Sequence, residues 1–340
     1  MRKKVLIIIM LLVLVVVALF SWNYFPEDYL GQPVEGCGDG TAIGECSVNK
    51  PYFCENGILI DHAVVCGCPE ILTQNGEFCT SKYRTKPKEI NLEYILRGEE
   101  ASVNLIVYGG LTDYLFSLPN TLSPVEGVQV SRADFKLRNI NNEEQKELLL
   151  PLVVAIQNLA ETKEDQVRIA VSIVQNLEFG WSGEILKIGR SEINYSRYPY
   201  ETLYDQQGVC GEKSELLAFL LKELNYGTVL FYHSEENHEA VGIECYGDYS
   251  LRNTAYCFIE TTGPAIITDS KIIYVGGSQL LSEPEYIFIS NGESLGADMY
   301  EYKDAKKLIR LRKNGINFLE RFFFDKLFEK YGLINEYHSG

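Results

Sequence analysis

Two side chains in this sequence are suited to thiol chemistry: Cys210, within Gly-Val-Cys-Gly at 208–211, and His238. Cys210 opens a predicted helix, whose unpaired first-turn N–H groups stabilise a thiolate. The same N–H groups can receive a developing oxyanion, and Gln206 or Gln207 is a further side-chain donor. An imidazole pairs with the thiolate and later protonates the leaving group. We therefore predict acyl transfer with Cys210 as nucleophile and His238 as base.

A carboxylate that orients the imidazole is predicted at Glu260. His238 precedes the predicted strand 239–246, and Glu260 ends the predicted strand 255–260. If the strands pair antiparallel with His238 opposite Glu260, both side chains point to one face at one sheet edge. The competing interpretations are a buried structural thiol at Cys210, a solvated turn histidine and an ordinary polar strand end.

These residues resemble the transglutaminase-like superfamily. The resemblance lies in Gly-Val-Cys at a helix start, a histidine that opens a strand, and an acid before Thr261 at the end of the next strand. It covers 165–262, less than a third of the chain. It implies an α+β fold with a papain-like core, in which Cys210, His238 and Glu260 are nucleophile, base and orienting acid.

The segment 198–203, Tyr-Pro-Tyr-Glu-Thr-Leu, is also similar to segments that precede the cysteine in microbial members. The sequence departs from the family pattern at three places. The acid is usually Asp and is Glu260 here, Ala240 replaces a frequent aromatic residue, and Cys-Phe at 257–258 replaces a frequent Trp.

Six of the nine cysteines lie in a stretch that is poor in apolar residues: Cys37, Cys46, Cys54, Cys66, Cys68 and Cys79. Such a stretch usually depends on covalent cross-links, so we predict three disulfides whose connectivity the sequence leaves open. A zinc site with His62, Cys66 and Cys68 is the disfavoured alternative, because paired Cys-x-x-Cys spacing is missing.

Cys245 and Cys257 invite a further disulfide that would leave Cys210 as the single free thiol. In the register that places His238 opposite Glu260, however, the two cysteines are offset by about 13 Å along the strand, beyond the ~7 Å Cα limit. A curled loop at 247–253 would close this gap. A regular hairpin that contains the bridge would instead place His238 opposite Pro264.

The N-terminus is predicted to be a membrane anchor. An uninterrupted apolar run extends from Val5 to Phe20, with Arg-Lys-Lys at 2–4 before it and acidic residues after it. This charge distribution places the N-terminus inside and the remaining chain outside. A cleaved signal peptide is the alternative, but no clean small-residue cleavage site follows the run.

Charge and motifs limit the classes of partner. The chain has 31 Lys and Arg against 47 Asp and Glu, so its acidic surface argues against nucleic-acid binding. No calcium loop, phosphate-binding loop, dinucleotide fingerprint or zinc helix is present, and we expect neither a cofactor nor a metal.

The predicted organisation has six parts: an anchor at 1–22, a tether at 23–36, a disulfide module at 37–80, a strand-rich then helical segment at 81–160, a catalytic core at 161–290 and a helical segment at 291–340. Strands are expected over 90–130 and at 272–275. A kink or break is expected at Pro151, and helical structure over 300–331.

The sequence thus predicts an extracytoplasmic, membrane-anchored thiol enzyme that cleaves or transfers acyl groups at amide bonds of peptides or proteins. Hydrolysis is favoured over cross-linking, since water is always available outside the cell and no feature marks an amine site. The alternative is a catalytically inactive binding module at the cell surface, with the cysteine-rich module as its recognition element for an unknown partner.

Overall fold

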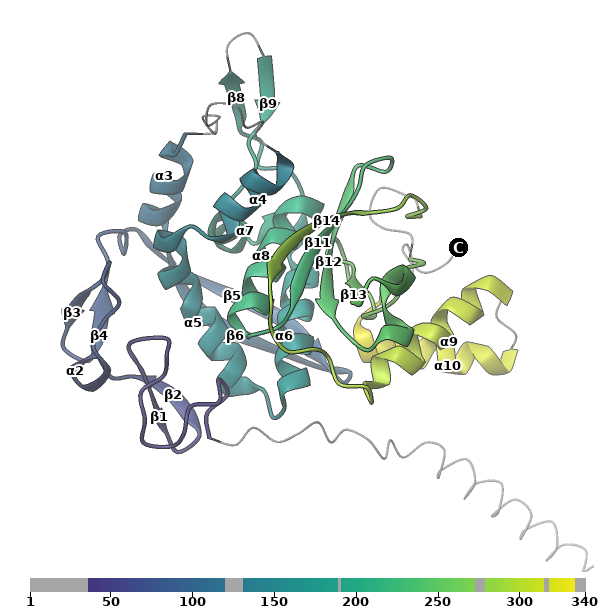
Figure 1. Cartoon of the computed structure of the whole chain (residues 1–340), viewed down its shortest axis with the longest axis horizontal. Helices are drawn as coiled ribbons and strands as arrows, with labels where there is room; N and C mark the ends of the chain where they lie inside the picture. Colours follow the sequence, from purple (N-terminus) through teal and green to yellow (C-terminus); the bar gives the residue numbers. More distant parts are fainter. Residues whose placement is uncertain (1–35, 120–130, 189–190, 273–278, 315–317, 334–340) are drawn as a thin grey trace, which may run out of the picture.

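A computed structural model describes residues 36–119, 131–188, 191–272, 279–314 and 318–333. Helices and mainly antiparallel strands are combined, which confirms the predicted α+β class. The largest sheet has four strands in the order β13-β12-β11-β14 (Figure 1). Their bounds are Tyr256–Ile259 for β13, His238–Glu244 for β12, Thr228–His233 for β11 and Glu285–Ser290 for β14. Strand β14 was not predicted.

Helix α8, Cys210–Glu223, packs against one face of this sheet and forms the centre of the core. It begins at Cys210, as predicted, and its apolar side chains are fully buried. Figure 1 shows α8 between the sheet and helices α5, Glu143–Leu159, and α6, Lys163–Asn176. Since α8 is enclosed on both sides, its N-terminus is held firmly at the edge of the sheet.

The register of β12 and β13 differs from the prediction. Val241 pairs with Ile259 and Gly242 with Phe258, so Glu260 lies two residues away from the position opposite His238. A shift of two residues keeps every side chain on its predicted face, because side chains alternate with a period of two. His238 and Glu260 therefore still share one face.

A disulfide joins Cys245 to Cys257 with a Cα separation of 5.7 Å. The hairpin is not regular, because residues 246–255 curl through two short 3-10 turns, η1 (Gly247–Tyr249) and η2 (Leu251–Asn253). Arg252, at φ 48°, lies in the left-handed region inside this loop. The register differs by two residues from the predicted one, and the loop is curled. Together these features allow the disulfide to form without placing His238 opposite Pro264.

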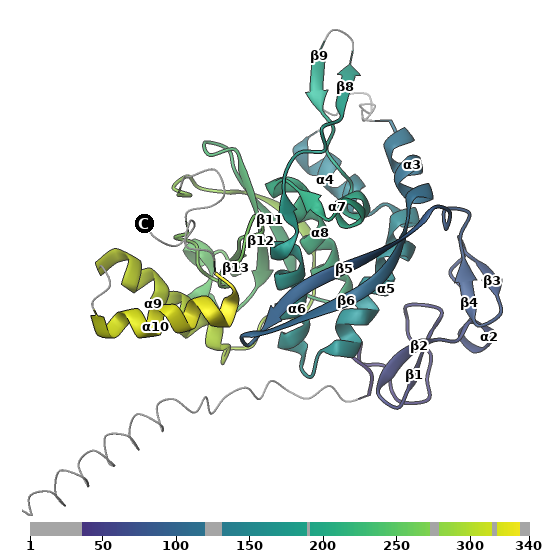
Figure 2. The same cartoon turned by 180° about the vertical axis from the view of Figure 1, so that it is seen from behind.

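A two-stranded ribbon of β5, Pro87–Leu96, and β6, Glu99–Tyr108, runs across the helices and lies in front of them in Figure 2. Its alternating apolar side chains enter the main core, which explains the strand pattern of the sequence. The prediction of strands beyond it is wrong over Gly109–Ser117, which form helix α3. Residues 120–130 lie outside the described part of the chain.

Helix α5 runs through Pro151 without ending there, so this proline does not break the helix. The side chains on either side of this proline are packed in the core, and that burial maintains the helix. Helix α6 begins as predicted, since the Thr162 hydroxyl accepts a hydrogen bond from the Asp165 N–H. Helix α4, Arg132–Ile140, lies against α8.

The three predicted disulfides of the N-terminal module are present: Cys37–Cys54, Cys46–Cys66 and Cys68–Cys79. They staple two small hairpins and one short helix: β1 (Tyr52–Glu55), β2 (Ile58–Asp61), α2 (Ala63–Cys66), β3 (Thr73–Asn75) and β4 (Phe78–Thr80). His62 pairs with Glu77 rather than with the cysteines. The module packs on α5, where the Asn158 amide bonds both the N–H and the carbonyl of Leu59.

The remaining elements flank the core. Strands β7 (Glu178–Phe179) and β10 (Gln207–Gly208) form a short parallel pair. Helix α7 (Pro199–Asp205) precedes α8. A hairpin of β8 (Ile185–Ile188) and β9 (Ser191–Asn194) projects from the body, as Figure 1 shows. The C-terminal segment that was predicted to be helical contains two helices, α9 (Tyr300–Asn314) and α10 (Phe318–Tyr331).

Three predictions fall wholly or mostly outside the described residues, namely the anchor at 1–22, the tether at 23–36 and the strand at 272–275. Across the ranges that are described, no helix combines the length and apolar character that crossing a bilayer requires.

Candidate functional site

Cys210, His238 and Glu260 come together at the edge of the large sheet. Cys210 begins α8, His238 begins β12, and Glu260 directly follows β13. The Nε2 atom of His238 lies 2.9 Å from Oε2 of Glu260, and the His238 ring is also hydrogen-bonded to the Cys210 side chain. Because Nε2 faces Glu260, Nδ1 is the ring nitrogen left for the sulfur.

The electrostatics of the three residues favour a charged imidazole. Burial opposes this charge, but the Glu260 carboxylate and the Cys210 hydrogen bond outweigh it and raise the pKa of His238 to about 10. Burial likewise opposes the charge on Glu260, yet the adjacent imidazole and hydrogen bonds lower its pKa to about 2. An imidazolium that persists at neutral pH stabilises a thiolate beside it.

Glu260 is completely enclosed and its second carboxylate oxygen is fully satisfied. Oε1 accepts hydrogen bonds from the N–H groups of Thr261 and Thr262 at 2.9 Å each, and from the Thr262 hydroxyl at 2.8 Å. These three donors fix the carboxylate, so Oε2 is directed at the imidazole.

Lys213 was not predicted, although it lies one turn after Cys210 on α8. Its side chain is inaccessible to solvent, and its ammonium donates to the carbonyls of Gln175, Leu177 and Thr262 at 3.2, 2.8 and 3.2 Å. Burial lowers the pKa of Lys213 to about 7, against the attraction of Glu260. Lys213 thus ties α8 to the end of α6 and to the loop that holds Glu260.

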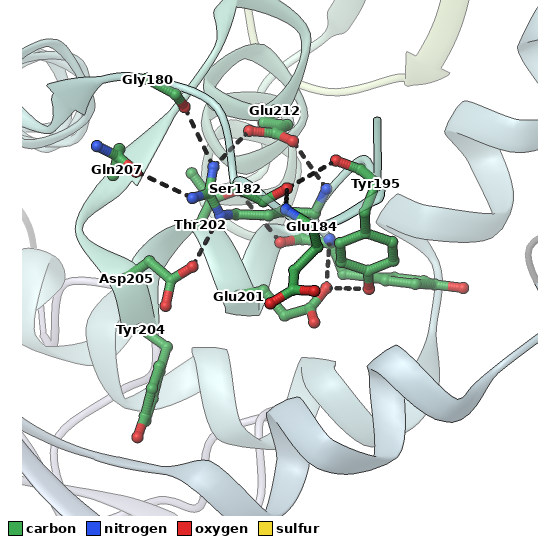
Figure 3. Close-up of polar contacts among 12 residues, drawn as sticks. Gly180, Ser182, Glu184, Tyr195, Glu201, Thr202, Tyr204, Asp205, Gln207 and Glu212 are labelled. Carbon is green, nitrogen blue, oxygen red and sulfur yellow. Dashed lines mark hydrogen bonds and ion pairs between the residues drawn. The ribbon is translucent and has the colours of Figure 1, made fainter. Parts of the chain in front are cut away.

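A second set of contacts anchors the first turn of α8, and its centre is Arg197. Figure 3 shows Gly180, Asp205, Gln207 and Glu212 around this guanidinium. Glu212 also accepts hydrogen bonds from the N–H groups of Val209 and Arg197.

These contacts bear on the prediction that Gln206 or Gln207 donates a hydrogen bond to an oxyanion. The side-chain oxygen Oε1 of Gln207 accepts a hydrogen bond from the Arg197 guanidinium at 3.0 Å, which leaves the side-chain N–H₂ group of Gln207 as a donor. Gln206 instead ends α7 in the left-handed region, at φ 55°.

A buried group of charges packs beside His238. The Lys136 ammonium, from α4, lies 2.6 Å from carboxylate oxygens of both Glu215 and Glu239. Glu239 adjoins His238 in β12, and a Cβ at Gly211 would lie 2.6 Å from its Oε2. The absence of a side chain at Gly211 therefore leaves room for the Glu239 carboxylate beside the start of α8.

Cys210 is a partly exposed free thiol; the other eight cysteines are in disulfides. Sequence reasoning identified it by elimination and by its helix start. It missed Lys213 and Arg197. The available signal for Lys213 was a lysine one turn after Cys210, on a helix whose later turns are apolar.

In the part of the chain that the structure covers, no group of three or more His, Cys, Asp and Glu side chains is placed to hold a metal ion. Comparison with known proteins found no family model that matches the chain and no curated protein that matches it.

Proposed function

We propose that this protein is a thiol enzyme of transglutaminase-like type, with a papain-like arrangement of its catalytic residues. Cys210 is the nucleophile, His238 the general base and acid, and Glu260 the residue that orients the imidazole. The observation that carries the proposal is the continuous set of hydrogen bonds from Glu260 through His238 to Cys210 at the start of a helix. A structural thiol does not require a buried, charge-paired imidazole beside it.

The residues act in a sequence that resembles other thiol acyl transfers. The Cys210 thiolate attacks an amide carbonyl carbon, and the oxyanion receives hydrogen bonds from the N–H groups at the start of α8. His238 donates its proton to the departing amine as the C–N bond breaks, which leaves a thioester on Cys210. Water, deprotonated by His238, then releases the acyl group and restores the thiol. Glu260 keeps the ring in one orientation and stabilises its charge throughout.

The substrate class is an amide bond of a peptide or protein outside the cell, and hydrolysis is favoured over transfer to an amine. Residues 1–22 are proposed to anchor the chain in the cell membrane with its N-terminus inside. After alkaline carbonate washing, the full chain should stay in the membrane pellet and a chain of residues 23–340 should be released. Release of both would contradict the anchor.

Alkylation of the full-length chain with iodoacetamide from pH 5 to 9 tests the catalytic proposal. We expect rapid labelling of Cys210 well below pH 8, because the imidazolium favours the thiolate. His238→Ala should slow the reaction at pH 6 by on the order of tenfold to hundredfold. The matched control is His62→Ala, since His62 pairs with a carboxylate in the disulfide module, far from Cys210 in the chain.

Equal labelling of Cys210 in the wild type and in His238→Ala would overturn the proposal and favour a catalytically inactive binding module. Mass spectrometry of the labelled peptide distinguishes Cys210 from cysteines released by reduction. Cleavage of casein-derived peptides by the wild type, and its loss in Cys210→Ala, is the expected confirmation of turnover.

A further inference from the structure

Helix α9 carries a charge opposite in sign to that of the whole chain. It contains six Lys and Arg side chains and two acids, a net charge of +4, whereas the chain has a formal charge of −16. Helix α10 has three basic and three acidic side chains and does not offset this charge. The two helices lie at one end of the molecule (Figures 1 and 2), which is therefore locally basic.

Four of the six cations form a basic stripe along one face of α9. The members of the stripe are exposed and recur at spacings of three and four residues: Lys303, Lys306, Arg310 and Lys313. At the rise of an α-helix the stripe is about 15 Å long. The opposite face is apolar and buried, with Ala305, Leu308 and Leu311 in a core cluster. The stripe therefore faces solvent.

The basic stripe is not neutralised by neighbouring acids. Among the residues that the structure describes, none of its four side chains forms a hydrogen bond or an ion pair. The two acids of α9 are engaged elsewhere, Asp304 with Lys330 at 2.8 Å and Glu301 with Arg168 at 2.6 Å. The positive charge of the stripe is therefore available to a partner.

The stability of α9 does not explain the stripe. Like charges three and four residues apart destabilise a helix. The helix dipole favours cations in the last turn, which accounts for Lys313 but not for Lys303 or Lys306. A binding role accounts for all of them.

An exposed aromatic ring adjoins the basic stripe. Nζ of Lys307, on α9, lies 3.8 Å from the centroid of the Phe323 ring. Phe322 packs on Phe323 with ring centroids 5.9 Å apart, and it is 54% exposed. Burial lowers the pKa of Lys307, and the nearby charge of Arg310 lowers it further, against the attraction of Asp304. Lys307 thus links the stripe to the two rings.

Cations beside an exposed aromatic ring favour one kind of anionic partner. A soluble polyanion offers charge without an apolar region, whereas a bilayer with anionic headgroups offers both. Basic side chains bind the headgroups, and a Phe ring enters the boundary between headgroups and acyl chains. The acidic remainder of the chain is repelled by the same surface, so contact through α9 has a defined orientation.

Contacts with the core keep the stripe in place. Leu308 and Leu311 share a buried cluster with Ile266, and Arg312 forms an ion pair with Asp269. Ile266 and Asp269 belong to the segment that follows β13. A bilayer bound at α9 would therefore set the orientation of the large sheet as well.

We infer that the basic stripe and Phe322 form a docking surface for a bilayer that contains anionic phospholipids. This surface is separate from the proposed catalytic residues and does not rest on the proposed thiol chemistry. It holds α9 against the bilayer and the acidic body away from it.

Acetylation of lysines in the full-length protein tests the surface. The protein is mixed with vesicles of phosphatidylcholine, alone or with about 30% phosphatidylglycerol, and treated with sulfo-N-hydroxysuccinimidyl acetate. Mass spectrometry gives the rate at each lysine. The readout is at α9 itself, and any binding through residues 1–22 is common to both kinds of vesicle.

Protection is expected only with the anionic vesicles. Each cation near such a surface strengthens binding about fivefold, so Lys303, Lys306 and Lys313 should react about tenfold more slowly there. About 0.5 M NaCl should remove the protection. Lys82 and Lys86, which are exposed in the linker before β5, should react equally with both kinds of vesicle.

A double variant removes the centre of the stripe. Lys306→Gln with Arg310→Gln should weaken docking about 25-fold and abolish most of the protection at Lys303 and Lys313. The matched control removes the same charge from the linker by replacing Lys82 and Lys86 with Gln, and it should retain the protection.

The aromatic ring has its own test. Phe322→Ser should also weaken the protection, and Phe322→Leu should restore it, because Leu again enters the acyl boundary. Phe322 and the stripe residues are exposed, so these variants should keep the circular dichroism spectrum of the wild type.

Three results would overturn the docking surface. One is equal acetylation of the stripe with both kinds of vesicle. Another is equal slowing at Lys82 and Lys86, which would indicate non-specific adsorption. The third is protection by soluble poly-glutamate that matches the protection by anionic vesicles and does not depend on Phe322, which would assign the stripe to a soluble polyanion.

Discussion

The disulfide module and the core around α8 maintain their structures by different means. The module has a small buried cluster of Cys37, Tyr52, Cys54 and Leu59 with Val154 of α5, and three disulfides supplement it. The core has a large apolar interior and also encloses charged groups such as Lys136, Lys213 and Glu260. One region depends on covalent constraint, and the other depends on keeping its buried charges paired.

The difference also separates the cysteines by role. In the module every cysteine is consumed by a disulfide, whereas Cys210 is free and is hydrogen-bonded to a charged imidazole. The free thiol thus lies in the region where buried charge is tolerated. Four changes test this division, beginning with the largest expected effect.

Lys136→Met should destabilise the protein by about 3–5 kcal/mol, because it leaves the buried carboxylates of Glu215 and Glu239 without their shared ammonium. Urea unfolding followed by circular dichroism measures the change. Lys86→Met is the matched control, since its ion pair with Asp113 is exposed and should contribute nothing measurable. Similar losses in the two variants would show that buried charge is not what distinguishes the core.

Replacing both Cys68 and Cys79 by Ser should cost about 3 kcal/mol within the module, because an 11-residue loop is no longer closed. Native-state hydrogen exchange should show lost protection in β3 and β4 and unchanged protection in α8. Cys210 alkylation should stay at the wild-type rate. A slowed alkylation would mean that the module supports the thiol site and that the two regions are not independent.

Glu260→Gln should lower stability by about 2 kcal/mol in a defined pH window. The pKa of Glu260 is lowered to about 2, so its stabilisation is present above about pH 4.5 and is lost as pH falls towards 2. The pKa of His238 is raised to about 10, so its stabilisation is present below about pH 6.5 and is lost as pH rises towards 10.

The stability gap between wild type and Glu260→Gln should therefore be widest from about pH 4.5 to 6.5 and narrow on either side. Unfolding in urea at a series of pH values measures this gap. Glu329→Gln, which removes an exposed ion pair with Lys326, is the control and should give a gap that is flat with pH. A flat gap for Glu260→Gln would contradict a charged pair at the site.

The smallest effect is expected at the contact between the two regions. Asn158→Ala removes both hydrogen bonds to the Leu59 backbone and should cost about 1 kcal/mol. The loss should appear in hydrogen exchange at Leu59 of β2 and not in α8. No change at Leu59 would indicate that apolar packing with Val154 alone holds the module in place.

Much of the site could be predicted because its chemistry is local. A glycine-flanked cysteine at a helix start and a histidine at a strand start are visible in the sequence, and the helix does begin at Cys210. The register of β12 and β13 was predicted incorrectly by two residues because the curl at 246–255 depends on left-handed residues such as Arg252. Nothing in residue type requires Arg in that conformation.

Tertiary packing also overruled local signals. Pro151 lies inside a continuous helix because the flanking side chains are buried, and Gly109 begins a helix in a stretch where strands were expected. In both places the local preference amounts to a few kcal/mol, which burial of neighbouring apolar side chains exceeds.

The sequence by itself determined the α+β class and the cross-linking of the six cysteines in the N-terminal module, because these follow from composition, periodicity and cysteine number. It left open the Cys245–Cys257 bridge, and with it Cys210 as the one free thiol. Tertiary structure decided which carboxylate oxygen reaches His238, why Gly211 has no side chain and where Lys213 places its charge. Those features depend on contacts between residues far apart in the chain, whose geometry is set only when α6, α8 and the sheet pack together.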